Sequence, residues 1–187
     1  MDENNVKLSK DDLNQALDRT NEWIENCDTK ASIVLGGIGV VFGILLASDY
    51  VKKISEIFNA MIKKSNCWSC LYMFLCVVAI GAIFVGTFFI IKVLVPKINT
   101  SIYSTKGIIS DSIIFFGTIA KNETFQDYKT KIDAYSESDL LNDIKSQIYI
   151  CSMICDKKFK NYKLGLTISI SGFSAFAILM IIGIWIT

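Results

Sequence analysis

Three long blocks of the sequence contain no charged residue, and they constrain the fold more than any other feature. The block at residues 31–48 has 18 residues, the block at 71–91 has 21, and the block at 164–187 has 24. A helix needs about 20 apolar residues to cross a hydrocarbon core of about 30 Å. A soluble domain would instead distribute its apolar residues with a period of two or 3.6. The sequence therefore predicts an integral membrane protein with three transmembrane helices.

Small residues recur at four-residue spacing in each block. This spacing places them on one helix face, where two backbones can approach closely. We therefore expect helix–helix packing, either within one chain or between the chains of a homo-oligomer. The pairs are Ser32 and Gly36, Gly39 and Gly43, Ala82 and Gly86, Gly165 and Ser169, and Ser171 and Ala175.

The polar segments that precede the first and third spans have the pattern of long amphipathic helices. Ser9 and Asp12 have the spacing of a capping box, and Ser138 is expected to cap the second of these helices. No helix-breaking residue separates either segment from its span, so each helix is expected to continue into the membrane. Aspartates near these starts, Asp11, Asp12, Asp139 and Asp143, are interpreted as capping charges on polar faces.

The region between the second and third spans is predicted to be a helical lobe. Ile102, Ile109, Ile113 and Phe116 are spaced as one helical stripe, and residues 124–135 are predicted to form a short amphipathic helix. The connection at residues 49–70 is treated as a short loop.

The sequence thus predicts an all-α membrane protein in four parts. These are an N-terminal amphipathic helix (1–30), a transmembrane hairpin (31–95, with spans at 31–48 and 71–91), a helical lobe (96–163) and a C-terminal transmembrane helix (164–187).

The distribution of basic residues suggests an orientation. With three spans, residues 1–30 and 92–163 share one side and carry 15 of the 19 basic residues, while residues 49–70 carry four. The total favours a cytoplasmic position for the lobe. The density of basic residues is no lower in the short loop, so the charge rule leaves the other orientation open.

Aromatic and basic residues at the ends of the apolar blocks are expected to lie at the membrane interface. Tryptophan and tyrosine prefer the headgroup level, and lysine can extend its ammonium group to lipid phosphates. The expected anchors are Trp23, Trp68, Lys92 and Trp185, and Tyr72 is placed at the same level as Trp68.

The sequence carries no recognisable active site. It has no histidine, no phosphate-binding loop and no nucleophile elbow, so we expect no enzymatic activity, no metal site and no cofactor. Cys67 and Cys70 have the spacing of a thiol–disulfide motif, but a redox enzyme also needs an αβ scaffold. Whether this pair forms a disulfide stays open. A near-neutral charge and a single arginine argue against a nucleic-acid polymer as partner.

Several short motifs follow one another in an order that resembles the Pycsar effector transmembrane family. They comprise Asn21-x-Trp23-Ile24, Asp28-x-Lys30-Ala31-Ser32 before a Gly-rich span, the run at 113–120, Tyr128, Asp139-Leu140-Leu141, Gln147-Ile148, Ser152 and Lys158-Phe159. The resemblance covers nearly the whole chain, because these motifs extend from the first helix to the last span.

The resemblance implies a role in anti-phage defence. In such systems a neighbouring cyclase makes a cyclic pyrimidine nucleotide, cUMP or cCMP, and the effector responds by disrupting the bacterial inner membrane. The infected cell then dies before phage mature, which is abortive infection. The lipid bilayer, the cyclic nucleotide and further copies of the chain are therefore the expected partners.

No segment alternates long enough to form a cyclic-nucleotide-binding β-barrel, so a nucleotide would bind to helices. Lysine can meet a phosphate as a point charge, an aromatic ring can stack on a base, and an amide can read its edge. The candidate ligand-binding residues are Asp28, Lys30, Tyr128, Gln147 and Lys158. The alternative function is a membrane-anchored adaptor whose helical lobe binds a protein partner.

Overall fold

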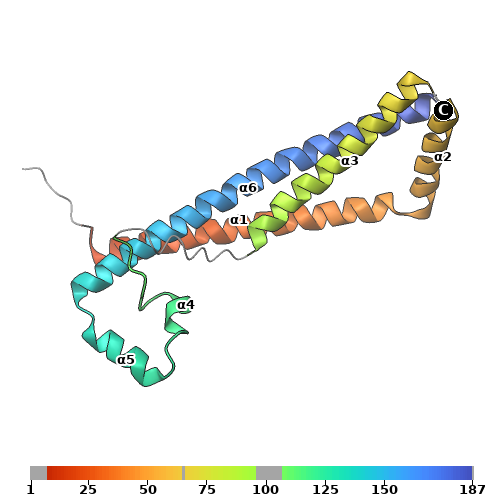
Figure 1. The fold of residues 1–187 in the computed structure, drawn as a ribbon. Coiled ribbons are helices and arrows are strands. Elements are labelled where there is room, and N and C mark those ends of the chain that lie inside the picture. Colours follow the sequence, from red (N-terminus) through yellow and green to blue (C-terminus); the bar gives the residue numbers. More distant parts are fainter. Residues whose placement is uncertain (1–7, 65, 96–106, 187) are drawn as a thin grey trace, which may run out of the picture. The chain divides into compact units, whose positions relative to one another are not determined.

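The computed structural model describes residues 8–64, 66–95 and 107–186 (Figure 1). Within these ranges α-helices are the only regular secondary structure, so the all-α prediction is confirmed. The helices are α1 (Lys10–Leu45), α2 (Ser48–Lys64), α3 (Cys67–Leu94), α4 (Phe116–Ile119), α5 (Phe125–Ala134) and α6 (Glu137–Ile186).

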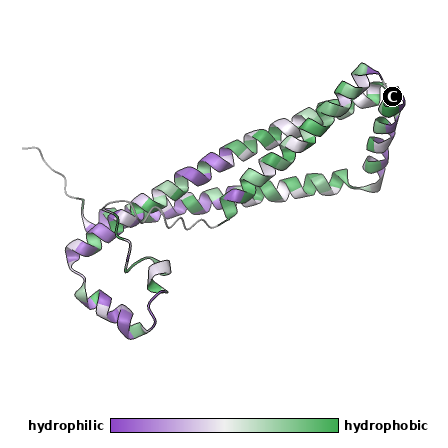
Figure 2. Cartoon of the chain, viewed as in Figure 1, coloured by the Kyte–Doolittle hydropathy of each residue, from purple (hydrophilic) through white to green (hydrophobic). Residues whose placement is uncertain are grey.

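Three of these helices, α1, α3 and α6, are long and apolar enough to cross a membrane. Each contains all or most of one of the predicted uncharged blocks, and Figure 2 shows the hydrophobic colouring along α3 and along the end of α6. The first span is shorter than predicted, since α1 ends at Leu45 and a turn follows before α2. Three transmembrane helices are thus present, as the charge-free blocks indicated.

Both long amphipathic segments continue into their spans without a break, as predicted. The start of α1 has the expected capping box, in which the Asp12 amide donates to Ser9 Oγ at 3.1 Å and the Ser9 amide donates to Asp12 Oδ2 at 2.9 Å. The predicted cap of α6 is wrong. Ser136 caps that helix, because its hydroxyl accepts from the Asp139 amide and its own amide donates to the Asp139 carboxylate.

The chain forms two compact units, which are described separately. The polar unit comprises residues 1–26 and 96–157, and the span unit comprises residues 27–95 and 158–187. The unit boundaries at residues 26 and 157 fall inside α1 and α6.

In the span unit, α3 lies along the end of α6 (Figure 1), and glycines permit the close approach. A Cβ atom added to Gly86 would lie 2.6 Å from the Ser169 amide nitrogen and 2.8 Å from the Gly165 carbonyl oxygen. A Cβ atom on Gly165 would lie 2.7 Å from the Gly86 carbonyl oxygen. Two of the predicted small-residue pairs therefore pack against each other within one chain. In contrast, Cβ atoms on Gly36, Gly39 or Gly43 of α1 would meet no atom within 4 Å.

Residues 48–64, which the sequence interpretation left as a loop, form the amphipathic helix α2. Ile57 and Met61 are buried against Tyr72 and Cys76 of α3. The four lysines of α2 are exposed. The spacing of Ile54, Ile57, Phe58 and Met61, at steps of three and one, is the signal that would have indicated this helix.

Candidate functional site

The most unusual side chain of the polar unit is Asp143, a carboxylate on α6 with no exposed surface. Its Oδ2 accepts hydrogen bonds from Ser112 Oγ and from the Ile113 amide, both at 2.9 Å. One helical turn further along α6, Ser146 Oγ accepts from the Ile109 amide at 3.2 Å. Side chains of α6 therefore hold the segment 109–113 against this helix.

These bonds explain why one sequence prediction fails. Ile109 and Ile113 were expected in a helical stripe, but both lie in irregular backbone, and helix α4 begins only at Phe116. The amides of Ile109 and Ile113 donate to side chains of α6 rather than to backbone carbonyls of a local helix. These backbone donors are therefore satisfied although the segment is not helical. Ile102, the remaining member of that stripe before Phe116, lies outside the described residues.

Helix α5 is anchored to the same segment. The predicted amphipathic helix at 124–135 is confirmed, with Thr124 as its cap. Tyr128 donates from its hydroxyl to the Ile113 carbonyl at 3.0 Å, and Lys131 Nζ lies 2.9 Å from Asp111 Oδ2. Tyr135 ends this helix, and its pKa is raised by burial first and then by the nearby carboxylates of Asp143, Asp111 and Asp139.

Two buried polar atoms of the polar unit, both on α6, have no hydrogen-bond partner among the described residues. They are Asp143 Oδ1, an acceptor, and Gln147 Nε2, a donor. The two residues are four positions apart, so they are neighbours on one helix face. A buried polar group without a partner costs about 1–3 kcal/mol. We call these two residues the Asp143–Gln147 pair, and it offers an acceptor beside a donor to any group that reaches it.

Asp143 is the residue that the sequence interpretation missed, because it was assigned to a polar helix face as a capping charge. Of the aspartates to which the sequence interpretation gave that role, Asp12 and Asp139 form such bonds with the residue that caps their helix. The buried face of α6 includes Asp143, Ser146, Gln147 and Ile150, at steps of three, one and three. That helical period, read without regard to polarity, is the signal that would have identified the residue.

A second polar cluster lies in the span unit and joins three helices. Lys158 Nζ of α6 lies 2.5 Å from Asp28 Oδ1 of α1 and donates to the Val93 carbonyl of α3 at 2.7 Å. Val93 is in the last turn of α3, where a positive charge is favourable. We call this contact the Asp28–Lys158 bridge. Its lysine side chain is 14% exposed and its aspartate side chain 36%.

The five predicted ligand-binding residues are therefore divided between the two units. Asp28 and Lys158 contact each other in the span unit, whereas Lys30 is exposed there. Tyr128 and Gln147 belong to the polar unit, where Tyr128 binds the Ile113 carbonyl and Asp143 binds the Ile113 amide. Their role in nucleotide binding stays a prediction.

The predicted membrane anchors have the exposure that such a role requires. Trp23, Trp68 and Trp185 are 57%, 77% and 87% exposed, and the Lys92 ammonium lies 4.4 Å from the centre of the Phe88 ring. Their position at a bilayer interface stays a prediction. Tyr72 differs from the expectation, because it is buried and its hydroxyl donates to the Leu179 carbonyl at 2.9 Å.

Cys67 and Cys70 are free and exposed in the first turn of α3. Among the described residues, no group of three or more histidine, cysteine, aspartate or glutamate side chains is placed to hold a metal ion.

Comparison with known proteins finds similarity over nearly the whole chain. A family model described as "Pycsar effector protein domain" matches residues 12–186. The Pycsar effector protein GmPycTM of Gulbenkiania mobilis is 32% identical over 178 residues, which cover 91% of this chain and 90% of the relative. No solved structure matches the chain.

Proposed function

Because this chain belongs to the Pycsar effector protein family, we propose that it is a membrane effector of anti-phage defence which a cyclic pyrimidine nucleotide activates. Bound cUMP or cCMP causes a homo-oligomer of the chain to disrupt the bacterial inner membrane, and abortive infection follows. The observation that carries this proposal is the family match from residue 12 to residue 186, which includes all three spans.

The proposed nucleotide contact is the Asp143–Gln147 pair. Uracil presents an N–H donor beside a carbonyl acceptor, and cytosine presents an amino donor beside a ring-nitrogen acceptor. An acceptor at Asp143 Oδ1 and a donor at Gln147 Nε2 complement either edge. Both atoms are buried, and the other oxygen of the Asp143 carboxylate binds the segment 109–113. In this proposal a nucleotide reaches the pair only when that segment leaves α6.

Ligand binding is therefore coupled to a change of conformation. A ligand shifts an equilibrium only by binding one state better than the other. The state with segment 109–113 bound to Asp143 and Ser146 excludes the nucleotide, and the open state admits it. Tyr128, which holds the same segment, is freed in the open state to stack on the base, and Lys30 stays a candidate for phosphate contact.

The proposed elements that transmit the change are the helices that continue into the membrane, around residues 19–30 and 138–163. The Asp28–Lys158 bridge ties α1, α3 and α6 together in the resting span unit. Breaking it removes a contact between spans, and the spans then rearrange. The polar unit lies in the cytoplasm in this proposal, where the cyclase product is made.

Dye release from liposomes tests the proposal. The purified chain is reconstituted in liposomes that contain a fluorescent dye, and cUMP, cCMP, cAMP and cGMP are added separately. We expect release with a cyclic pyrimidine nucleotide and none with the purine nucleotides. Gln147→Ala should weaken the response to nucleotide, whereas Lys145→Ala, at an exposed site on the same helix, should not. Liposomes that stay tight with all four nucleotides contradict the proposal.

A second candidate function is a membrane-anchored adaptor. The polar unit exposes two large aromatic side chains, Phe116 (68%) and Phe125 (77%), which a partner protein could cover. The adaptor predicts that replacing the three spans by unrelated ones leaves defence intact. The effector predicts that the same exchange abolishes dye release and defence.

A further inference from the structure

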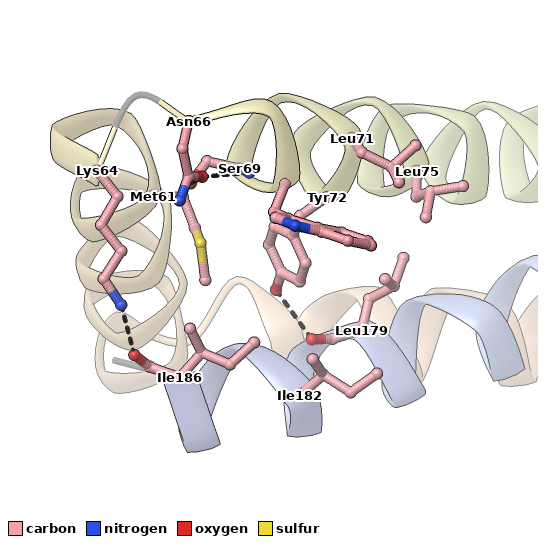
Figure 3. Close-up of a pocket in the computed structure, with 11 residues that line it drawn as sticks. Met61, Lys64, Asn66, Ser69, Leu71, Tyr72, Leu75, Leu179, Ile182 and Ile186 are labelled. Atoms are coloured by element: carbon pink, nitrogen blue, oxygen red, sulfur yellow. Dashed lines mark hydrogen bonds between the residues drawn. The ribbon is translucent and has the colours of Figure 1, made fainter.

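The span unit contains a groove that the proposed nucleotide response does not use. A cavity of about 540 Å³ lies between the ends of α2, α3 and α6 (Figure 3), with Leu71, Leu75, Leu179 and Ile182 among its walls. A second cavity, of about 410 Å³, lies further along the same two helices and shares Leu75 and Leu179 with the first. The two cavities are thus adjacent along α3 and α6, and we call them together the α3–α6 groove.

Short side chains line the second cavity, which is the part of the groove farther along α3 from Trp68. Ala79 and Ala82 of α3 face Gly172 and Ala175 of α6 along its walls. None of these four residues has a side chain longer than a methyl group, so the space beside the packed backbones stays unfilled. Volumes of this size are typical of sites for small molecules, which range from about 300 to 1,000 Å³.

The Tyr72 hydroxyl, the Asn66 side-chain oxygen and the Ser69 hydroxyl, at the outer end of the groove, already have protein partners. The Tyr72 hydroxyl donates to the Leu179 carbonyl, and Asn66 Oδ1 accepts from the amide and hydroxyl of Ser69 (Figure 3). Most of the surface left for an occupant is therefore apolar. A hydrocarbon chain suits it better than a polar ligand.

The outer end of the groove, next to α2, also carries a positive charge. Lys64 lines the first cavity and donates one hydrogen bond to the Ile186 carbonyl at 2.8 Å (Figure 3). An ammonium group has three N–H donors, so two remain for another acceptor. Lys63, its neighbour in the last turn of α2, adds a second exposed charge. The groove therefore combines apolar walls with a basic rim, which complements a chain with an anionic head.

The length of the groove matches one leaflet of a bilayer. Leu71, which lines the first cavity, and Ala82, which lines the second, are eleven residues apart on α3. At 1.5 Å per residue this is about 16 Å, close to half of the hydrocarbon thickness of about 30 Å. An acyl chain that lies along the helices would thus extend from the interface to the middle of the membrane.

We propose that the α3–α6 groove binds one acyl chain of an anionic phospholipid, whose phosphate contacts Lys64. The bound lipid fills the space that the short side chains leave and comes from the leaflet next to α2. This inference does not depend on the proposed nucleotide response.

Native mass spectrometry of the full chain tests the proposal. The chain is purified in detergent, stripped of lipid and titrated with dioleoylphosphatidylglycerol or with the zwitterionic dioleoylphosphatidylcholine. We expect one phosphatidylglycerol bound to each chain, and weaker binding of phosphatidylcholine. Exchanging Lys63 and Lys64 for glutamine should remove this preference, because the remaining walls recognise only hydrocarbon.

Two variants fill the groove, and a third serves as the matched control. Ala82→Phe and Ala175→Phe each place a ring in the second cavity. Each should weaken lipid binding about tenfold, or by about 1.4 kcal/mol. Val77→Phe, at a 66% exposed site on α3 that does not line the groove, should leave binding unchanged. Equal lipid binding by the filled variants and the control overturns the proposal. A second result would also overturn the proposal, namely that the wild-type chain without lipid is a dimer and that Ala82→Phe dissociates it. In that case a second copy of the chain occupies the groove.

Discussion

At the scale of single residues, Asp143 differs from the other aspartates of α6 because it is buried and binds a distant segment of the chain. Exposed aspartates at helix starts, such as Asp12 and Asp139, bind the nearby backbone, and bonds from Ser9 and Ser136 lower their pKa. Asp143 lies one turn beyond Asp139 and binds instead to segment 109–113 across the polar unit. An aspartate therefore binds the backbone three residues away at position 139, and the backbone 30 residues away at position 143.

Removing the Asp143 carboxylate should loosen that segment. Asp143→Ala leaves the Ser112 hydroxyl and the Ile113 amide without their acceptor, and each lost bond to a buried group costs about 1–3 kcal/mol. We expect faster hydrogen exchange of the amides at 109–115 than in the wild type. Lys145→Ala, at an exposed site on α6, is the control and should exchange as the wild type does. Unchanged protection in Asp143→Ala would show that other contacts hold the segment.

At the scale of helices, glycines have two different roles in the spans. Gly86 and Gly165 are buried at the contact of α3 with α6, where each would place a Cβ atom against the other helix's backbone. Gly81 on α3 and the glycines of α1 have open space around them. Helix–helix contacts in membranes depend on close packing of small residues. The four-residue spacing identified such faces but did not separate the packed pairs from the exposed ones.

The packed glycine should not tolerate a methyl group. In Gly86→Ala the new Cβ atom meets the Ser169 amide and the Gly165 carbonyl, which move only if the helices separate. We expect this overpacking to lower the stability by about 1–3 kcal/mol. Gly81→Ala, five residues earlier, should be neutral or stabilising because alanine favours a helix over glycine. Thermal unfolding of both variants in detergent measures the difference, and equal midpoints would contradict it.

At the scale of the whole molecule, α1, α3 and α6 meet at the Asp28–Lys158 bridge, which takes one group from each of these three helices. These groups are separated by 65 and 130 residues of sequence, so the bridge exists only in the folded chain. The spans themselves form through hydrophobicity, whereas the bridge determines how their ends are held together.

Breaking the bridge should make the effector leak without its ligand. Lys158→Met removes the charge that neutralises Asp28 and caps α3, while it keeps an unbranched side chain of similar length. We expect dye release from liposomes in the absence of nucleotide. Lys157→Met, at the exposed neighbouring position, should leave the liposomes tight. Equal basal release by the two variants would remove the bridge from the proposed mechanism.

The sequence by itself determined the helical class, the three spans and the helices that continue into two of them. These features depend on hydrophobicity and on local hydrogen bonds, as at Ser9 and Thr124, which a short stretch of sequence contains. It also indicated the family, through the order of short motifs.

Only the tertiary structure decided which polar groups are buried and which partners they bind. Segment 109–113 is irregular, rather than helical as had been predicted, because Asp143 and Ser146 of α6 accept hydrogen bonds from its amides. Lys158, one of the candidates for phosphate contact, binds Asp28 and the end of α3, and no local pattern predicted these partners. The α3–α6 groove arises where small residues of two spans face each other. Such contacts depend on the relative rotation of helices distant in sequence, which no local pattern records.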